Sequence, residues 1–151
     1  MEDIIKEQFI SDYPLPISIE QTEKIISQMK SSVVKIYKGG FKGTGFLCKI
    51  PEFDSKKISY FLITNHHVLK EDDIKLDSII SFSISDQSQL KSLSLSSNRK
   101  IFTNETLDVT FIEIFPEKDQ LIKNNFLEID ENINQNGETL KNYYIKKPYI
   151  Q

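Results

Sequence analysis

The chain contains two histidines, His66 and His67, and they are adjacent at the end of the apolar run Tyr60–Asn65. Imidazole has an ordinary pKa of about 6.5, so it can take and return a proton near neutral pH. It does this well when a second group, usually a carboxylate, fixes its tautomer and orientation. The dipeptide is therefore a candidate for a metal site, for a general base with an incidental neighbour, or for neither.

Asp108 is the carboxylate that best fits His67. It opens the run DVTFIEI, which has the composition of a strand, after the polar stretch TNETL. His67 follows the strand-like run ISYFLITN, and the interval between the two residues leaves room for about two or three strands. His67 is therefore a candidate general base and Asp108 its candidate orienting acid, a pairing that requires a ring nitrogen about 2.6–3.2 Å from a carboxylate oxygen. The alternatives are an exposed histidine at a strand end and an aspartate that ends a turn by binding local amides.

His66 is a weaker candidate for a metal ligand. Adjacent side chains diverge on a strand or a helix, and structural zinc sites usually have four ligands. The nearby acids Glu71, Asp72 and Asp73 are typical of a solvated turn. We expect no metal and no cofactor.

Four of the five glycines, Gly39, Gly40, Gly43 and Gly45, lie close together. Such a cluster can bind phosphate, but the Walker pattern GxxxxGK[ST] is absent and no helical segment follows it. We expect a sharply twisted hairpin, or a place where another part of the chain approaches closely.

Seven runs rich in Val, Ile, Phe and Thr predict the strands that position these residues. The runs are short and are separated by polar or glycine-containing segments, which is typical of a small antiparallel barrel or sandwich. They are SVVKIYK, GTGFLCKI, ISYFLITN, SIISFSIS, LKSLSLS, RKIFTN and DVTFIEI. The predicted fold is mainly β: a six- or seven-stranded antiparallel β-barrel preceded by one amphipathic helix.

The helix is predicted over residues 17–31. Ser18 and Gln21 have the spacing of a capping box, and apolar residues including Ile26 and Met29 recur at helical spacing. We interpret residues 1–31 as an arm that packs this apolar stripe on the body, and residues 32–151 as the barrel domain. The last residues, YYIKKPYIQ, resemble the beginning of a strand, so we expect the domain to be truncated at its C-terminal end.

Charge and hydropathy exclude several classes of partner. The formal net charge is −3, which does not favour binding to a phosphate backbone, so we expect no nucleic acid partner. No stretch approaches the roughly 20 apolar residues of a membrane span, and the acidic N-terminus is unlike a signal peptide. One cysteine, Cys48, fits a reducing compartment. We expect a cytoplasmic protein without a membrane partner.

Three segments together resemble the N-terminal half of the trypsin-like serine peptidases, the chymotrypsin-fold superfamily. They are GTGFLCKI (Gly43–Ile50), FLITNHHVL (Phe61–Leu69) and LDVTFIEI (Leu107–Ile114). In that family a glycine-containing strand precedes a strand that ends T-N-x-H-V, and an aspartate before alternating apolar residues comes later. The resemblance assigns the family's base to His67 and its orienting acid to Asp108, with His66 at the variable position.

The chain departs from the family because it has no GxSGG-like turn with a nucleophilic serine. The resemblance implies that a second β-barrel supplies the serine, the oxyanion hole and the specificity pocket for a peptide or protein substrate. We therefore expect a serine endopeptidase half that is inactive alone. Two alternatives stay open, namely a non-catalytic β-barrel protein-interaction module and a degenerate peptidase.

Overall fold

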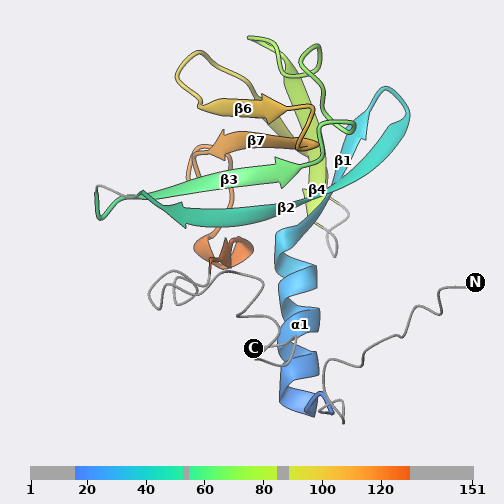
Figure 1. Ribbon diagram of the computed structural model, residues 1–151, viewed down its shortest axis with the longest axis vertical. Coiled ribbons are helices and arrows are strands. Elements are labelled where there is room, and N and C mark those ends of the chain that lie inside the picture. Colours follow the sequence, from blue (N-terminus) through green and yellow to red (C-terminus); the bar gives the residue numbers. More distant parts are fainter. Residues whose placement is uncertain (1–15, 53–54, 85–88, 130–151) are drawn as a thin grey trace, which may run out of the picture. The chain divides into compact units, whose positions relative to one another are not determined.

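The computed structural model describes residues 16–52, 55–84 and 89–129 (Figure 1). The chain divides into two compact units. One unit, Ile25–Ile129, contains every strand of the described residues. Of the other unit, the structure describes residues 16–24. The predicted strand at Tyr143–Gln151 lies outside the described residues.

Helix α1 spans Ile19–Ser32 and begins with the predicted capping box. The Gln21 amide donates to Ser18 Oγ at 3.1 Å, and the Ser18 amide donates to Gln21 Oε1 at 3.0 Å, so two free amides at the helix start are satisfied. At the other end, Asn125 Nδ2 donates to the carbonyl of Ser31 at 2.9 Å. The predicted burial of the apolar stripe is wrong for Ile26 and Met29, which are 47% and 56% exposed.

Seven antiparallel strands form one sheet, and each overlaps one of the seven predicted runs. Their order across the sheet is β5-β4-β1-β2-β3-β7-β6. The strands are β1 (Val33–Lys38), β2 (Phe41–Pro51), β3 (Ile58–Thr64), β4 (Ile79–Ile84), β5 (Lys91–Ser94), β6 (Ile101–Asn104) and β7 (Val109–Ile114). A two-residue strand, β8 (Leu127–Glu128), follows the 3₁₀ turn η1 (Lys123–Asn125) and pairs in parallel with β2. It is too short to leave a pattern in the sequence.

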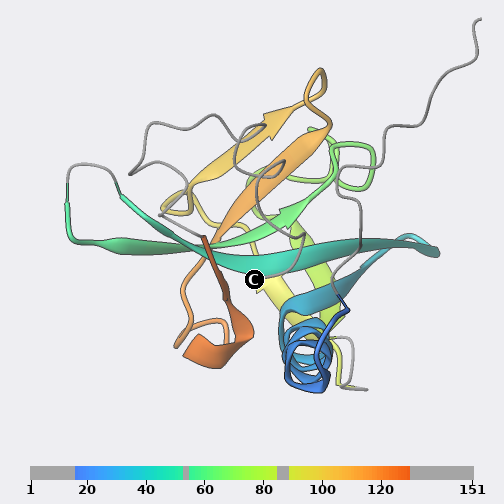
Figure 2. The same ribbon diagram turned by 60° about the horizontal axis from the view of Figure 1, so that its bottom comes forward.

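The sheet curls into a half-barrel, as the turned view shows (Figure 2). Within the described residues, no pairing joins the end strands β5 and β6. The mainly β, antiparallel fold with one preceding helix is thus confirmed. No helix in the described part of the chain is long and apolar enough to cross a membrane.

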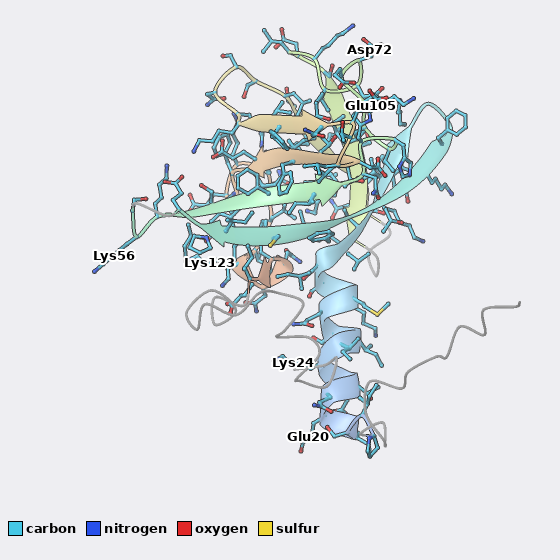
Figure 3. All side chains as sticks on the ribbon, in the orientation of Figure 1. Glu20, Lys24, Lys56, Asp72, Glu105 and Lys123 are labelled. Atoms are coloured by element: carbon cyan, nitrogen blue, oxygen red, sulfur yellow. The ribbon has the colours of Figure 1, made fainter. Side chains whose placement is uncertain are left out.

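The core lies on one face of the sheet, because strand residues alternate between its two faces and the buried ones are in register with one another. Side chains cover both faces (Figure 3). Each fully buried aliphatic or aromatic side chain contributes about 1.5–3 kcal/mol. Those with 2% exposure or less are Val34, Ile36, Leu47, Leu62, Leu69, Phe82, Ile84, Leu93, Leu95, Ile112 and Ile114. They come from six of the seven antiparallel strands, from the residue that follows β5 (Leu95) and from the turn after β3 (Leu69), so this turn is anchored in the core.

The glycine cluster has both predicted roles. Gly39 and Gly40 form the β1–β2 turn with φ of 48° and 88°, values that side chains disfavour. At Gly45 a Cβ atom would lie 2.7 Å from the Ile63 carbonyl of the neighbouring strand. The first two glycines permit the turn, and the third permits close packing of β2 on β3.

Candidate functional site

Strand pairing brings the two predicted site residues to one edge of the sheet. β3 and β7 are antiparallel neighbours, and Thr64, the last residue of β3, lies opposite Thr110 near the start of β7. The residues that follow β3 and those that precede β7 therefore meet. His67 lies in the first group and Asp108 in the second. Asp72 and Glu105, labelled in Figure 3, lie in the loops after β3 and before β7.

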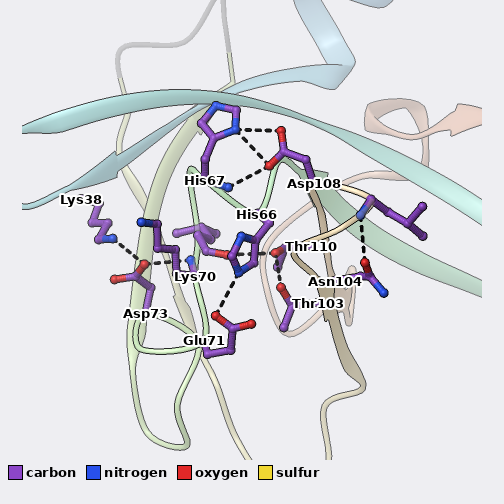
Figure 4. Close-up of polar contacts among 12 residues, drawn as sticks. Lys38, His66, His67, Lys70, Glu71, Asp73, Thr103, Asn104, Asp108 and Thr110 are labelled. Carbon is purple, nitrogen blue, oxygen red and sulfur yellow. Dashed lines mark hydrogen bonds and ion pairs between the residues drawn. The ribbon is translucent and has the colours of Figure 1, made fainter.

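His67 and Asp108 form a close pair (Figure 4). His67 Nδ1 is 2.8 Å from Asp108 Oδ2 and 3.0 Å from Oδ1, within the predicted distance. The backbone amide of His67 also donates to Asp108 Oδ1 at 3.0 Å. The carboxylate is thus held by the backbone of the same residue whose ring it contacts.

The electrostatics of the pair keep Asp108 ionised. The pKa of Asp108 lies below its ordinary value, chiefly because the His67 amide donates to the carboxylate, and desolvation opposes this effect. Contacts with the His67 ring and Asn65 lower the pKa further. An ionised carboxylate only accepts hydrogen bonds, so the neutral imidazole carries its proton on Nδ1 and has a lone pair on Nε2. The side chains of His67 and Asp108 are 68% and 45% exposed, which leaves the pair open to solvent.

Asn65 also contacts this carboxylate, a role that the sequence pattern did not predict. Its Nδ2 donates to Asp108 Oδ2 at 3.1 Å and to the Asp108 carbonyl at 3.2 Å. Asp108 has φ of 49°, a left-handed conformation that is uncommon for residues other than glycine and often marks functional sites. The asparagine belongs to the T-N-x-H-V segment, so its position was visible in the sequence but its contact was not.

The turn that carries His67 is fixed by backbone and packing contacts. The amides of Val68 and Leu69 donate to the Asn65 carbonyl at 3.1 and 3.3 Å. Buried Thr110 donates its hydroxyl to the Leu69 carbonyl at 2.9 Å and so connects the turn to β7. Val68 packs on β2 at Gly43, where a Cβ atom would lie 2.3 Å from Val68 Cγ1.

His66 points away from His67 and has a carboxylate partner of its own (Figure 4). Its Nε2 lies 2.9 Å from Glu71 Oε2, and its side chain is 7% exposed. The contact with His66 holds the pKa of Glu71 below its ordinary value. His66 therefore links the turn after β3 to Glu71 and does not share a ligand with His67. In the described ranges, no group of three or more His, Cys, Asp or Glu residues could hold a metal ion.

Comparisons of the chain with models of protein families, with curated proteins and with solved structures found no match. An imidazole with Nδ1 on a carboxylate and Nε2 open to solvent can accept a proton from a hydroxyl, a thiol or water. Across the part of the chain that the structure describes, no hydroxyl or thiol is bonded to the His67 ring.

Proposed function

We propose that this chain is the N-terminal half of a trypsin-like serine endopeptidase, with His67 as general base and Asp108 as its orienting acid. One observation carries the proposal. The two residues that the sequence pattern singled out, 41 positions apart, lie with His67 Nδ1 2.8 Å from Asp108 Oδ2. The main-chain bond from His67 to Oδ1 and the position of the pair at a sheet edge add support.

The proposed reaction assigns each proton. His67 Nε2 takes the hydroxyl proton of a serine on a second β-barrel while the serine oxygen forms a bond to the carbonyl carbon of a peptide. The imidazolium that results is stabilised by Asp108, and it then gives the proton to the leaving amine as the peptide bond breaks. Water then attacks the acyl-enzyme in the same way: His67 Nε2 takes a proton from the water and returns it to the serine oxygen as the ester bond breaks. The second barrel supplies the serine, the oxyanion hole and the pocket that selects the peptide or protein substrate.

The test is to purify the chain from its own cells together with any polypeptide that is attached or bound to it. A tagged form is purified with all bound or covalently continuous polypeptide and treated with a fluorophosphonate probe, which acylates activated serines. We expect a labelled serine outside residues 1–151. His67→Ala and Asp108→Asn should abolish or strongly reduce this labelling, because the base and its orienting acid act as a unit with the nucleophile.

The matched control is His66→Gln, which alters the adjacent histidine but leaves His67 and Asp108 unchanged. Labelling should persist in this variant. Purified material with no labelled serine, or labelling that is the same in His67→Ala as in the unmodified protein, would contradict the proposal. We also propose that the protein works in the cytoplasm, and the location of the tagged form checks this directly.

A non-catalytic protein-interaction module is the second candidate, and one feature of the sheet favours it. Phe46, Ile63, Phe111 and Phe102 occupy matching positions across β2, β3, β7 and β6 on the face opposite Leu62. Phe46 and Phe102 are 38% and 51% exposed. Exposed aromatic side chains are typical of protein contact sites. Recovery of a bound protein without any fluorophosphonate-reactive serine would favour this candidate.

A further inference from the structure

The Asp108 carboxylate can fix the orientation of the His67 ring only if a group other than His67 also restrains this carboxylate. Three of the four close contacts of its carboxylate oxygens come from His67: the amide to Oδ1, and Nδ1 to both oxygens. The fourth is Asn65 Nδ2, at 3.1 Å from Oδ2. Among the described residues, Asn65 is thus the one donor to this carboxylate that is independent of His67.

The backbone of Asp108 needs a similar restraint. Its φ of 49° lies in the left-handed region, which is uncommon for a residue with a Cβ atom. The same Asn65 amide group donates to the Asp108 carbonyl at 3.2 Å, and the Asp108 amide donates to the Glu105 carbonyl at 3.0 Å. Asn65 therefore restrains both the unusual backbone conformation and the direction of the side chain.

Asn65 also belongs to the turn that carries His67. Its own carbonyl accepts from the amides of Val68 and Leu69. Its backbone thus starts the turn that presents the imidazole, while its side chain binds the acid on the other strand. The amide orientation is fixed by chemistry, since both Asp108 atoms are acceptors and only the NH₂ group of asparagine can donate to them.

We infer that Asn65 is a positioning residue, which holds Asp108 in its left-handed conformation with both carboxylate oxygens against His67 and thereby keeps the neutral His67 ring protonated on Nδ1. This inference deepens the proposed function and rests on it for its consequence in catalysis. The positioning itself is a property of this chain and can be measured without a second barrel. The Asn65 side chain does not touch the proposed reacting atoms, so its effect passes through Asp108 and His67.

Nuclear magnetic resonance of the chain gives the decisive test. Imidazole ¹⁵N shifts report which ring nitrogen of His67 carries the proton, and the carboxyl ¹³C shift reports the titration of Asp108. In Asn65→Ala we expect a larger share of neutral His67 protonated on Nε2. We also expect a higher pKa for Asp108, because a hydrogen bond to its ionised form is lost.

A second variant, Asn65→Asp, keeps the size of the side chain but replaces the donor with an acceptor. Two carboxylates would then face each other, so the rise in the pKa of Asp108 should exceed that in Asn65→Ala. The control is Asn98→Ala, which removes an exposed asparagine bonded to Ser96 and should leave both signals unchanged. Unchanged His67 tautomer and Asp108 titration in folded Asn65→Ala, or equal behaviour of the Ala and Asp variants, would overturn the inference.

The consequence for catalysis is measured separately, on the tagged material described above. Asn65→Ala should slow fluorophosphonate labelling roughly tenfold, in keeping with the loss of one hydrogen bond to a charged group. If the resonance signals shift but no serine is ever labelled, the positioning role stands and the peptidase proposal fails. If labelling depends on His67 but the resonance signals of Asn65→Ala do not move, the peptidase proposal stands and the Asn65 assignment fails.

Discussion

At the residue scale, the two histidines of one dipeptide have different partners and different surroundings. His67 is largely exposed and faces Asp108, whereas His66 is buried and faces Glu71. Both rings contact a carboxylate, so the residue type does not separate them. Of the two histidines, only His67 presents its ring to solvent, so only His67 can contact a molecule outside this chain.

Gly43 is the residue whose substitution should most directly disturb the turn that carries His67. A Cβ atom there would lie 2.3 Å from Val68 Cγ1. We expect Gly43→Ala to lower the free energy of unfolding by about 1–3 kcal/mol through overpacking, and to shift the amide resonances of residues 65–69. Chemical denaturation and a two-dimensional amide spectrum measure these effects.

A double-mutant cycle separates this clash from a general glycine effect. Val68→Ala removes both methyl groups that a Cβ on Gly43 would meet, so Gly43→Ala should cost less in the Val68→Ala background. Gly40→Ala is the control for backbone strain, since Gly40 has φ of 88° and no neighbour within 4 Å of its ideal Cβ. Strictly additive costs for Gly43→Ala and Val68→Ala would rule out the proposed contact.

Glu52 should give the protein a stability change at acid pH. Hydrogen bonds from Ser59 and Ser55 and the nearby Lys100 amine lower the pKa of Glu52 from 4.5 to about 2. Because the folded-state pKa is depressed, the stabilisation is present above the unfolded value and is lost as pH falls through the folded one. Between pH 5.5 and pH 2.5, the free energy of unfolding measured with urea should therefore fall less in Glu52→Gln than in the unmodified chain.

The control for Glu52 is Glu105→Gln, which removes a carboxylate from the loop before β7. Across the same pH range, the free energy of unfolding of this variant should fall as much as that of the unmodified chain. A decline in Glu52→Gln as steep as that of the unmodified chain would show that the Ser59 and Ser55 contacts do not stabilise the folded state in solution.

At the element scale, the site depends on the contact between β7 and the turn after β3. Thr103 and Thr110 are paired across β6 and β7, with their hydroxyl oxygens 2.8 Å apart. Because Thr110 donates to the Leu69 carbonyl, it accepts from Thr103. This chain of hydroxyls ties two strands to the turn at the same edge where His67 and Asp108 meet.

Thr110→Val should destabilise the protein by about 1–3 kcal/mol. Valine has nearly the shape of threonine, so the cost comes from the Leu69 carbonyl, which loses its hydroxyl donor in a buried position. Thr103→Val removes only the outer of the two hydroxyls and should lower the free energy of unfolding by less. Denaturant unfolding of both variants measures the difference, and an equal or larger cost for Thr103→Val would contradict this account.

At the scale of the whole molecule, the described residues place the His67 imidazole against the Asp108 carboxylate, and none of them bonds a hydroxyl or thiol to this imidazole. Members of a catalytic triad act together, and the contribution of each collapses when another is missing. The exposed fractions of His67 and Asp108 also mean that water screens the pair, which weakens its electrostatic coupling. A covering element that excludes water would strengthen it.

The chain of residues 1–151 alone should therefore not hydrolyse peptides. We expect no cleavage of a general peptide substrate and no covalent label from a fluorophosphonate. The purified chain, incubated at high concentration and examined by intact mass spectrometry, provides the measurement. Specific acylation of any serine in it, abolished by His67→Ala, would show that the chain has a nucleophile of its own.

The sequence by itself determined the strands, the helix cap and the types of residue that could do chemistry. These features are local: apolar runs broken by polar turns define strands, and the Ser18 and Gln21 spacing defines a cap wherever the helix lies. The presence of a histidine after one strand and an aspartate before another was equally visible.

Only the tertiary structure decided which strands are neighbours. The pairing of β3 with β7 joins segments separated by three other strands, and it depends on many weak contacts summed over the sheet, which no local pattern encodes. That pairing places Asp108, with its left-handed backbone, against His67 and gives Asn65 its contact. It also leaves His66 buried beside Glu71, because the turn must bend back toward the core to place Leu69 there.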